Sequence, residues 1–221
     1  MNPLRLEIKR ILFSVWMLPT MLMISVGLAY MTYRIGVYPQ QKDSLVCLSL
    51  LLGNVEYHIF LYAVLAMALV GVDISADIPL LEILAGNTLL HFHWRKVILY
   101  AIAVLVCELL YLTLPLFLWG ISLSPLWRML PTRLFLYLGI AMPFFTLQAV
   151  LPNPQTMLIG DTTAAILWIG FFDDDLNAWH SAVLGIRALP AQWFVLATLS
   201  IVISILVSLK LLTNKRRLQI K

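Results

Sequence analysis

Long apolar runs separated by short polar connections make up most of the chain. Six of these runs approach or exceed the length of about 20 residues that a membrane-crossing helix needs. They cover approximately residues 11–33, 55–72, 97–121, 134–151, 155–172 and 191–209. Because backbone N–H and C=O groups in lipid must be satisfied within their own segment, each run is predicted to be a helix. The pattern therefore predicts an all-α membrane protein with six transmembrane helices, in a single domain over residues 1–221.

The residues before the first run have an amphipathic pattern. Within residues 3–12, Leu4 and Ile8 share one helical face. Arg5 and Lys9 share another face. This spacing predicts a short N-terminal helix that lies in the membrane interface, with a plain basic anchor as the alternative.

The connection between the second and third runs, residues 73–96, carries helix signals of its own. Ser75 or Asp77 suits a helix cap and Pro79 suits a first turn, while Gly86-Asn87 suits a stop. Between these signals lie four apolar residues and one acid: Leu80, Leu81, Glu82, Ile83 and Leu84. The pattern predicts a short helix with an apolar surface. This surface is expected either to bind another protein or to lie on the membrane surface.

Composition and charge agree with a membrane protein and indicate its orientation. Hydrophobic residues make up 62% of the chain and charged residues only 12%, whereas about a quarter of an ordinary soluble domain is charged. With six spans both termini share one side, and ten of the 15 Lys and Arg residues fall on that side. The excess predicts cytoplasmic termini in a cell inner or plasma membrane. We interpret the net charge of +4 as a mark of the cytoplasmic side of the membrane. The basic residues are expected to contact membrane lipids, and no nucleic-acid partner is expected.

Two acids inside apolar runs are the main candidates for chemistry. Glu108 lies in the third run and Asp161 in the fifth. An ionisable group at that depth faces a protein interior or water, so both are candidates for a translocation path. The alternatives are a Glu108 that hydrogen-bonds between helices and an Asp161 that caps a helix beginning at Thr162.

No catalytic residue, metal site or cofactor is expected in this chain. Glu56 and His58, near the start of the second span, are two residues apart and do not share a helical face. Ser122 with His180 as its base would suggest an intramembrane protease, but Ser122 ends its span and His180 falls in a connection. The outer connection that holds Ser122 covers residues 122–133. The sequence contains no G-x-x-x-x-G-K-[ST] loop, so no ATP site of that kind is predicted.

The connection over residues 73–96 carries a resemblance to a known family. Asp73 and Asp77 precede the core Leu81-Glu82-Ile83-Leu84, and the cations Arg95-Lys96 lead into the third span. This order, together with the six-span layout, resembles ABC-2 type transporter permeases, the membrane subunits of ABC exporters.

The resemblance implies a function and a set of partners. Residues Leu80, Leu81, Glu82, Ile83 and Leu84 would form a coupling helix on a separate ABC ATPase subunit, which would bind the ATP and Mg. A second permease chain would complete a homodimer or heterodimer. The chain would be a transporter subunit rather than an enzyme, and the exported substrate an amphiphile such as a peptide, lipid or drug. A non-transporting membrane scaffold or assembly factor is the alternative, and an intramembrane protease a more distant one.

Overall fold

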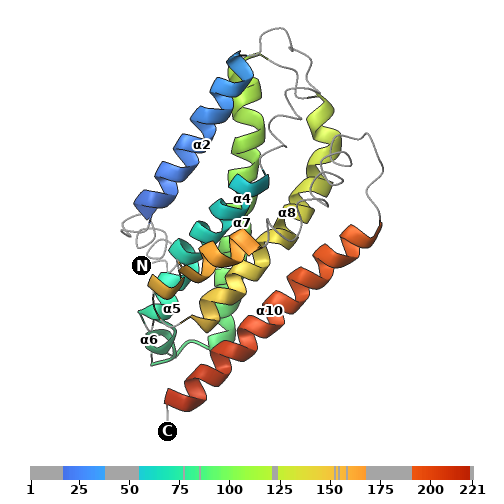
Figure 1. Ribbon diagram of the computed structural model, residues 1–221. Coiled ribbons are helices and arrows are strands. Elements are labelled where there is room, and N and C mark those ends of the chain that lie inside the picture. The colour runs from blue at the N-terminus through green and yellow to red at the C-terminus, as the bar shows by residue number, and fades with distance from the viewer. Residues whose placement is uncertain are drawn as a thin grey trace.

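All secondary structure in the described part of the chain is helical (Figure 1). The computed structural model describes residues 17–37, 55–76, 78–84, 86–120, 124–151, 153, 155–157, 159–167 and 191–219. The helices are α2 (Met17–Val37), α4 (Val55–Ala66), η2 (Met67–Gly71), α5 (Val72–Ser75), α6 (Ile78–Leu84), α7 (Leu89–Leu118), α8 (Ser124–Val150) and α10 (Ala191–Gln219). Residues 155–157 and 159–167 are also helical.

Four helical stretches among the described residues are long and apolar enough to cross a membrane. They are Tyr57–Ile74, Leu89–Leu118, Leu130–Val150 and Phe194–Asn214. These stretches correspond to the second, third, fourth and sixth predicted runs and confirm that these runs are helical. A shorter apolar stretch, Met17–Tyr30, lies in α2, within the first predicted run. The interfacial helix predicted over residues 3–12 lies outside the described residues.

The helices extend beyond the predicted apolar runs. Helix α7 begins at Leu89 rather than at Val97, because the Thr88 side chain caps it and accepts the His91 N–H at 3.2 Å. Helix α8 begins at Ser124, so most of the predicted outer connection is helical. Helix α10 continues to Gln219. Hydropathy marks where a chain leaves lipid, whereas caps and prolines determine where a helix ends.

The second span changes helix type at its centre. Between α4 and α5 lies the π-helical turn η2, whose residues are all buried. The Val72 N–H donates to Met67 O, which is the wider hydrogen-bonding pattern of a π-helix. A Cβ at Gly71 would collide with Gln148 Oε1 and lie 2.7 Å from Met157 Sδ. The wide turn therefore packs closely against α8 and the segment that follows it, and glycine permits this approach.

Helix α10 lies alongside α8 (Figure 1) and packs on it through small residues. A Cβ at Gly139 would lie only 2.7 Å from Ala197 Cβ. Ser200 Oγ donates to Gly139 O at 2.6 Å, and Thr146 Oγ1 donates to Ser204 O at 3.1 Å. Small residues and hydroxyl hydrogen bonds of this kind hold helices together where lipid removes the hydrophobic driving force.

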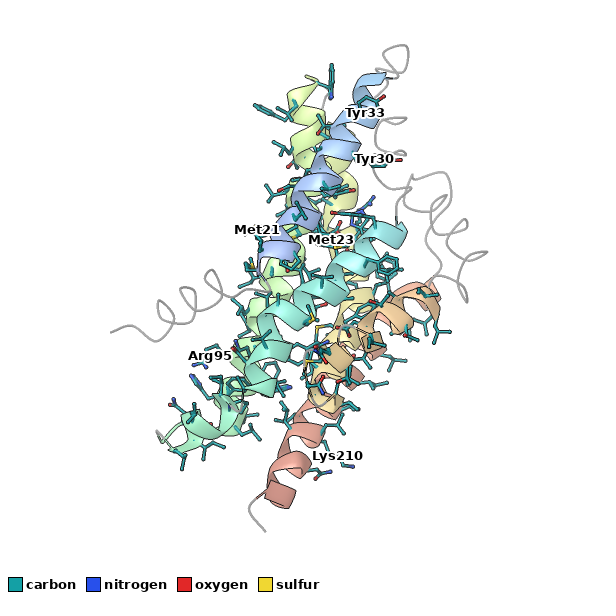
Figure 2. All side chains as sticks on the ribbon, turned by 60° about the vertical axis from the view of Figure 1, so that its left-hand side comes forward. Met21, Met23, Tyr30, Tyr33, Arg95 and Lys210 are labelled. Carbon is teal, nitrogen blue, oxygen red and sulfur yellow. The ribbon has the colours of Figure 1, made fainter. Side chains whose placement is uncertain are left out.

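The two ends of the bundle differ in their side chains. Figure 2 shows Arg95 and Lys210 near one end, and Tyr30 and Tyr33 of α2 toward the opposite end. Helix α6 and the C-terminal end of α10 lie at the same end of the molecule (Figure 1). At the opposite end the Trp119 indole N–H donates to Thr32 O at 2.9 Å and ties α7 to α2.

Candidate functional site

Helix α6 is a separate short helix on the connection between two spans. It packs against α5 and α7, with Pro79 buried and Ile78 in contact with the core of the bundle. Three apolar side chains point away from that contact: Leu81 is 57% exposed, Ile83 37% and Leu84 75%. The side chains of Leu80 and Glu82 lie outside the described part. Helix α6 thus presents an apolar surface that the described residues do not cover.

The predicted stop after α6 is confirmed. Gly86 has φ +90° and donates its N–H to Ile83 O at 2.9 Å. This backbone conformation suits glycine because it has no Cβ. The prediction of a cap at Ser75 or Asp77 concerns side chains that the structure does not describe.

A buried ion pair joins the two helices that flank α6. Lys96 of α7 pairs with Asp73 of α5, and the two side chains are 1% and 9% exposed. The Lys96 ammonium also donates to Leu69 O in η2 at 3.1 Å and lies 5.8 Å from the centre of the Phe92 ring. Lys96, expected as an entry cation, therefore lies inside the bundle. Its neighbour Arg95 is half-buried and also lies 5.8 Å from the Phe92 ring centre.

A second buried group surrounds Glu108, and we refer to it as the Glu108 cluster. Its members come from α4, α7 and α8: His58, Tyr62, Glu108, Tyr111, Arg133 and Tyr137. The Glu108 carboxylate oxygen Oε1 lies 2.5 Å from His58 Nδ1 and accepts a hydrogen bond from the Tyr62 hydroxyl. Glu108 and His58 are 0% exposed. The alternative of a glutamate hydrogen-bonded between helices therefore matches this geometry.

Aromatic rings from α7 and α8 pack against the His58 ring of the cluster. The His58 ring stacks on Tyr137 with centroids 5.1 Å apart and meets Tyr111 edge-on at 4.6 Å. Arg133 donates to the Tyr137 hydroxyl at 2.6 Å, and its guanidinium carbon lies 4.8 Å from the same ring centre. Arg133 is only 2% exposed, although the sequence analysis placed it in an outer connection.

Several buried atoms of the cluster have no hydrogen-bond partner among the described residues. They are His58 Nε2, Glu108 Oε2, the Tyr111 hydroxyl, and Arg133 Nε and Nη1. A buried polar atom without a partner costs about 1–3 kcal/mol. The described residues therefore satisfy only part of the hydrogen-bonding capacity of this cluster.

Asp161 belongs to a third buried contact. It lies inside the helical segment 159–167, so it does not cap a helix that begins at Thr162. Both of its carboxylate oxygens accept from Gln148 Nε2, at 2.9 and 3.0 Å. The same amide nitrogen lies 3.0 Å from Phe144 O. Asp161 and Glu108 are thus buried in separate contacts.

The sequence analysis missed the partners in these contacts. His58 and Arg133 enter the Glu108 cluster, although neither was expected to meet Glu108. The spacing of the polar residues could have indicated part of this cluster. His58 and Tyr62 are four residues apart, as are Arg133 and Tyr137, so each pair shares a helical face. Ser122 and His180 lie outside the described residues. Within the described ranges, no group of three or more His, Cys, Asp or Glu residues could hold a metal ion.

The described part of the chain is helical, and four of its helical stretches are long and apolar enough to cross a membrane. Comparison of the chain with protein-family models, curated proteins and solved structures finds no match.

Proposed function

We propose that the chain is the membrane subunit of an ATP-driven exporter of the ABC-2 type, which exports an amphiphilic peptide, lipid or drug. The observation that carries the proposal is α6, a separate helix with Leu81, Ile83 and Leu84 exposed. A connection that only reverses the chain direction needs few residues and no exposed leucines. An exposed apolar surface of this kind usually marks a protein contact.

The proposed partner of α6 is a soluble ATPase subunit that binds ATP and Mg. The sequence contains no phosphate-binding loop of its own, so the energy source would have to come from another chain. Leu81 and Leu84 would enter a groove on this ATPase, and Glu82 would pair with a cation there. Rigid attachment of α6 to the bundle through Ile78 and Pro79 supports a role in transmitting movement.

The proposal includes six crossings with both termini in the cytoplasm of a cell inner or plasma membrane. Helix α2 and the segment 159–167 would belong to the first and fifth crossings. The position of α6 and the end of α10 at one end of the bundle (Figure 1) supports one cytoplasmic face. Arg95 and Lys210 near the same end agree with the excess of cations expected there (Figure 2). A second permease chain would complete the transporter.

Glu108 and Asp161 are assigned to helix association in the described conformation. Each is buried and hydrogen-bonded within this chain. A substrate path through either residue would require the helices around it to separate. The proposed path therefore runs between two permease chains, along faces that the single chain leaves exposed.

The test is recovery of an ATPase from native membranes with the tagged chain. The double variant Leu81→Asp with Leu84→Asp is expected to remain in the membrane and lose the ATPase, because charged residues would have to enter an apolar groove. Leu81→Met with Leu84→Met is the matched control, because it keeps apolar side chains of similar volume at the same two exposed positions. This control is expected to retain the ATPase. Mass spectrometry of the mild-detergent eluate is the measurement.

Two outcomes would contradict the proposal. One is a wild-type chain that recovers no ATPase. The other is equal ATPase recovery by the wild-type chain and by the Leu81/Leu84 double variant. That result would indicate that α6 lies on the membrane surface and does not bind the ATPase.

A further inference from the structure

We infer that the buried Asp73–Lys96 ion pair transmits movement of α6 into the spans by acting on the π-helical turn η2. The inference rests on the proposed function, because it requires a partner that moves α6. It assigns Asp73 and Lys96 as positioning residues.

The ion pair closes a loop of chain around α6. Asp73 lies in α5, directly before α6, and Lys96 lies near the start of α7, directly after it. A helix on a free loop could move without moving its neighbours. Because the flanking helices are joined by opposite charges in a buried site, α6 and its two flanks are expected to move as one unit.

The same lysine connects this unit to the irregular centre of the second span. Lys96 Nζ donates to Leu69 O at 3.1 Å, and Leu69 belongs to η2. A π-helical turn contains a wider hydrogen-bonded ring than an α-helical turn, and such turns are frequent at functional sites. A change between π-helical and α-helical hydrogen bonding would shift the helix on one side of η2 relative to the other. In this inference η2 is the element that changes between two arrangements, which is what energetic coupling between distant sites needs.

The opposite side of η2 contacts the rest of the bundle. Gly71 packs so closely on Gln148 and Met157 that a Cβ there would collide with Gln148 Oε1. Gln148 in turn donates to the carboxylate of Asp161 in the segment 159–167. A shift in η2 would therefore press directly on α8 and on the segment after it. The contacts run from Lys96 through η2 to Gln148 and Asp161.

Replacing Asp73 and Lys96 together tests whether the pair transmits the movement of α6 or only stabilises the fold. One buried charge left without its partner is strongly destabilising, whereas replacement of both partners is often tolerated. Asp73→Asn combined with Lys96→Met keeps similar side-chain volumes and removes both charges of the pair. If the pair only stabilises the fold, this double variant will behave as the wild-type chain does.

The experiment measures a nucleotide-dependent distance change in the complex with the ATPase. Spin labels are placed at Ile166→Cys and Leu206→Cys, whose native side chains are 57% and 61% exposed, after both native cysteines are replaced by alanine. Electron–electron resonance gives the distance distribution with and without ATP plus vanadate. The wild-type background is expected to shift, and the Asp73→Asn/Lys96→Met background is expected to retain the ATPase but show no shift.

Two further variants complete the design. Lys210→Met removes an exposed lysine and is expected to leave the shift unchanged. Lys96→Arg keeps both charges of the buried pair, so it remains testable if the double variant fails to fold. Its planar guanidinium replaces the ammonium that donates to Leu69 O, so its shift is expected to be smaller than wild type.

The outcomes distinguish this inference from the proposed function. Absence of an ATPase on the wild-type chain overturns the proposed function and the inference with it. An ATPase-bound wild-type chain with no shift overturns the inference alone. A full shift in the double variant, or in Lys96→Arg where only that variant folds, also overturns the inference alone.

Discussion

The two buried charged groups that join the second span to α7 differ in how completely they are hydrogen-bonded. Near α6, Lys96 contacts both the Asp73 carboxylate and the Leu69 carbonyl. In the Glu108 cluster, Glu108 uses one carboxylate oxygen for two contacts and leaves the other without a partner among the described residues. Arg133 similarly uses one guanidinium nitrogen and leaves two unpartnered in the described part.

This difference shows that burial alone does not define the role of an intramembrane charge. A charge with satisfied bonds holds its neighbours in one arrangement, since any movement breaks several contacts at once. A buried polar atom without a partner instead raises the free energy of the folded state, because it has lost its hydrogen bonds to water. The Asp73–Lys96 pair thus suits a mechanical link, whereas the Glu108 cluster joins its helices while leaving several polar atoms without partners among the described residues.

The largest effect is expected from Lys96→Met. This variant leaves the Asp73 carboxylate in a buried site without its cation, so the free energy of unfolding should fall by about 3–5 kcal/mol. The measurement is the unfolding equilibrium in mixed detergent. Asp73→Asn in the same chain should recover most of the loss, and failure to recover would show that Lys96 stabilises the fold mainly through other contacts.

A smaller effect is expected from Glu108→Gln. The amide oxygen still accepts from the Tyr62 hydroxyl, but the charge that strengthens this bond is lost, so the loss should be about 1–2 kcal/mol. Membrane insertion should remain normal, as judged by the membrane fraction of the expressed protein. A loss equal to that of Lys96→Met would mean that the Glu108 cluster is as fully bonded as the pair near α6.

The smallest effect is expected from Arg133→Met. The variant removes one hydrogen bond to the Tyr137 hydroxyl, and it also removes two buried nitrogens without partners among the described residues. These contributions oppose each other, so the free energy of unfolding should change by less than about 1 kcal/mol. Thermal unfolding beside the Lys96→Met variant gives the comparison. A loss of several kcal/mol would assign hydrogen bonds to those two nitrogens.

The helical class and the short helix at residues 78–84 were predictable because their signals are local. Apolar runs of sufficient length predict helices in lipid, and Pro79 and Gly86 enclose α6 in the sequence. The start of α7 was missed because Thr88, a capping residue, was read as part of a connection. Arg133 was placed outside its span because an arginine lowers the hydropathy of a window even when the bundle buries it.

The sequence by itself determined that this protein is helical and that its helices are apolar enough for a membrane. It also determined that a short helix, bounded by Pro79 and Gly86, lies between two of them. Only the tertiary structure decided which polar residues meet. His58 and Glu108 are separated by 50 residues in the chain, and Lys96 and Leu69 by 27. Helical periodicity defines the faces of one helix but not which faces of different helices pack together, and the pairing of buried charges depends on that packing.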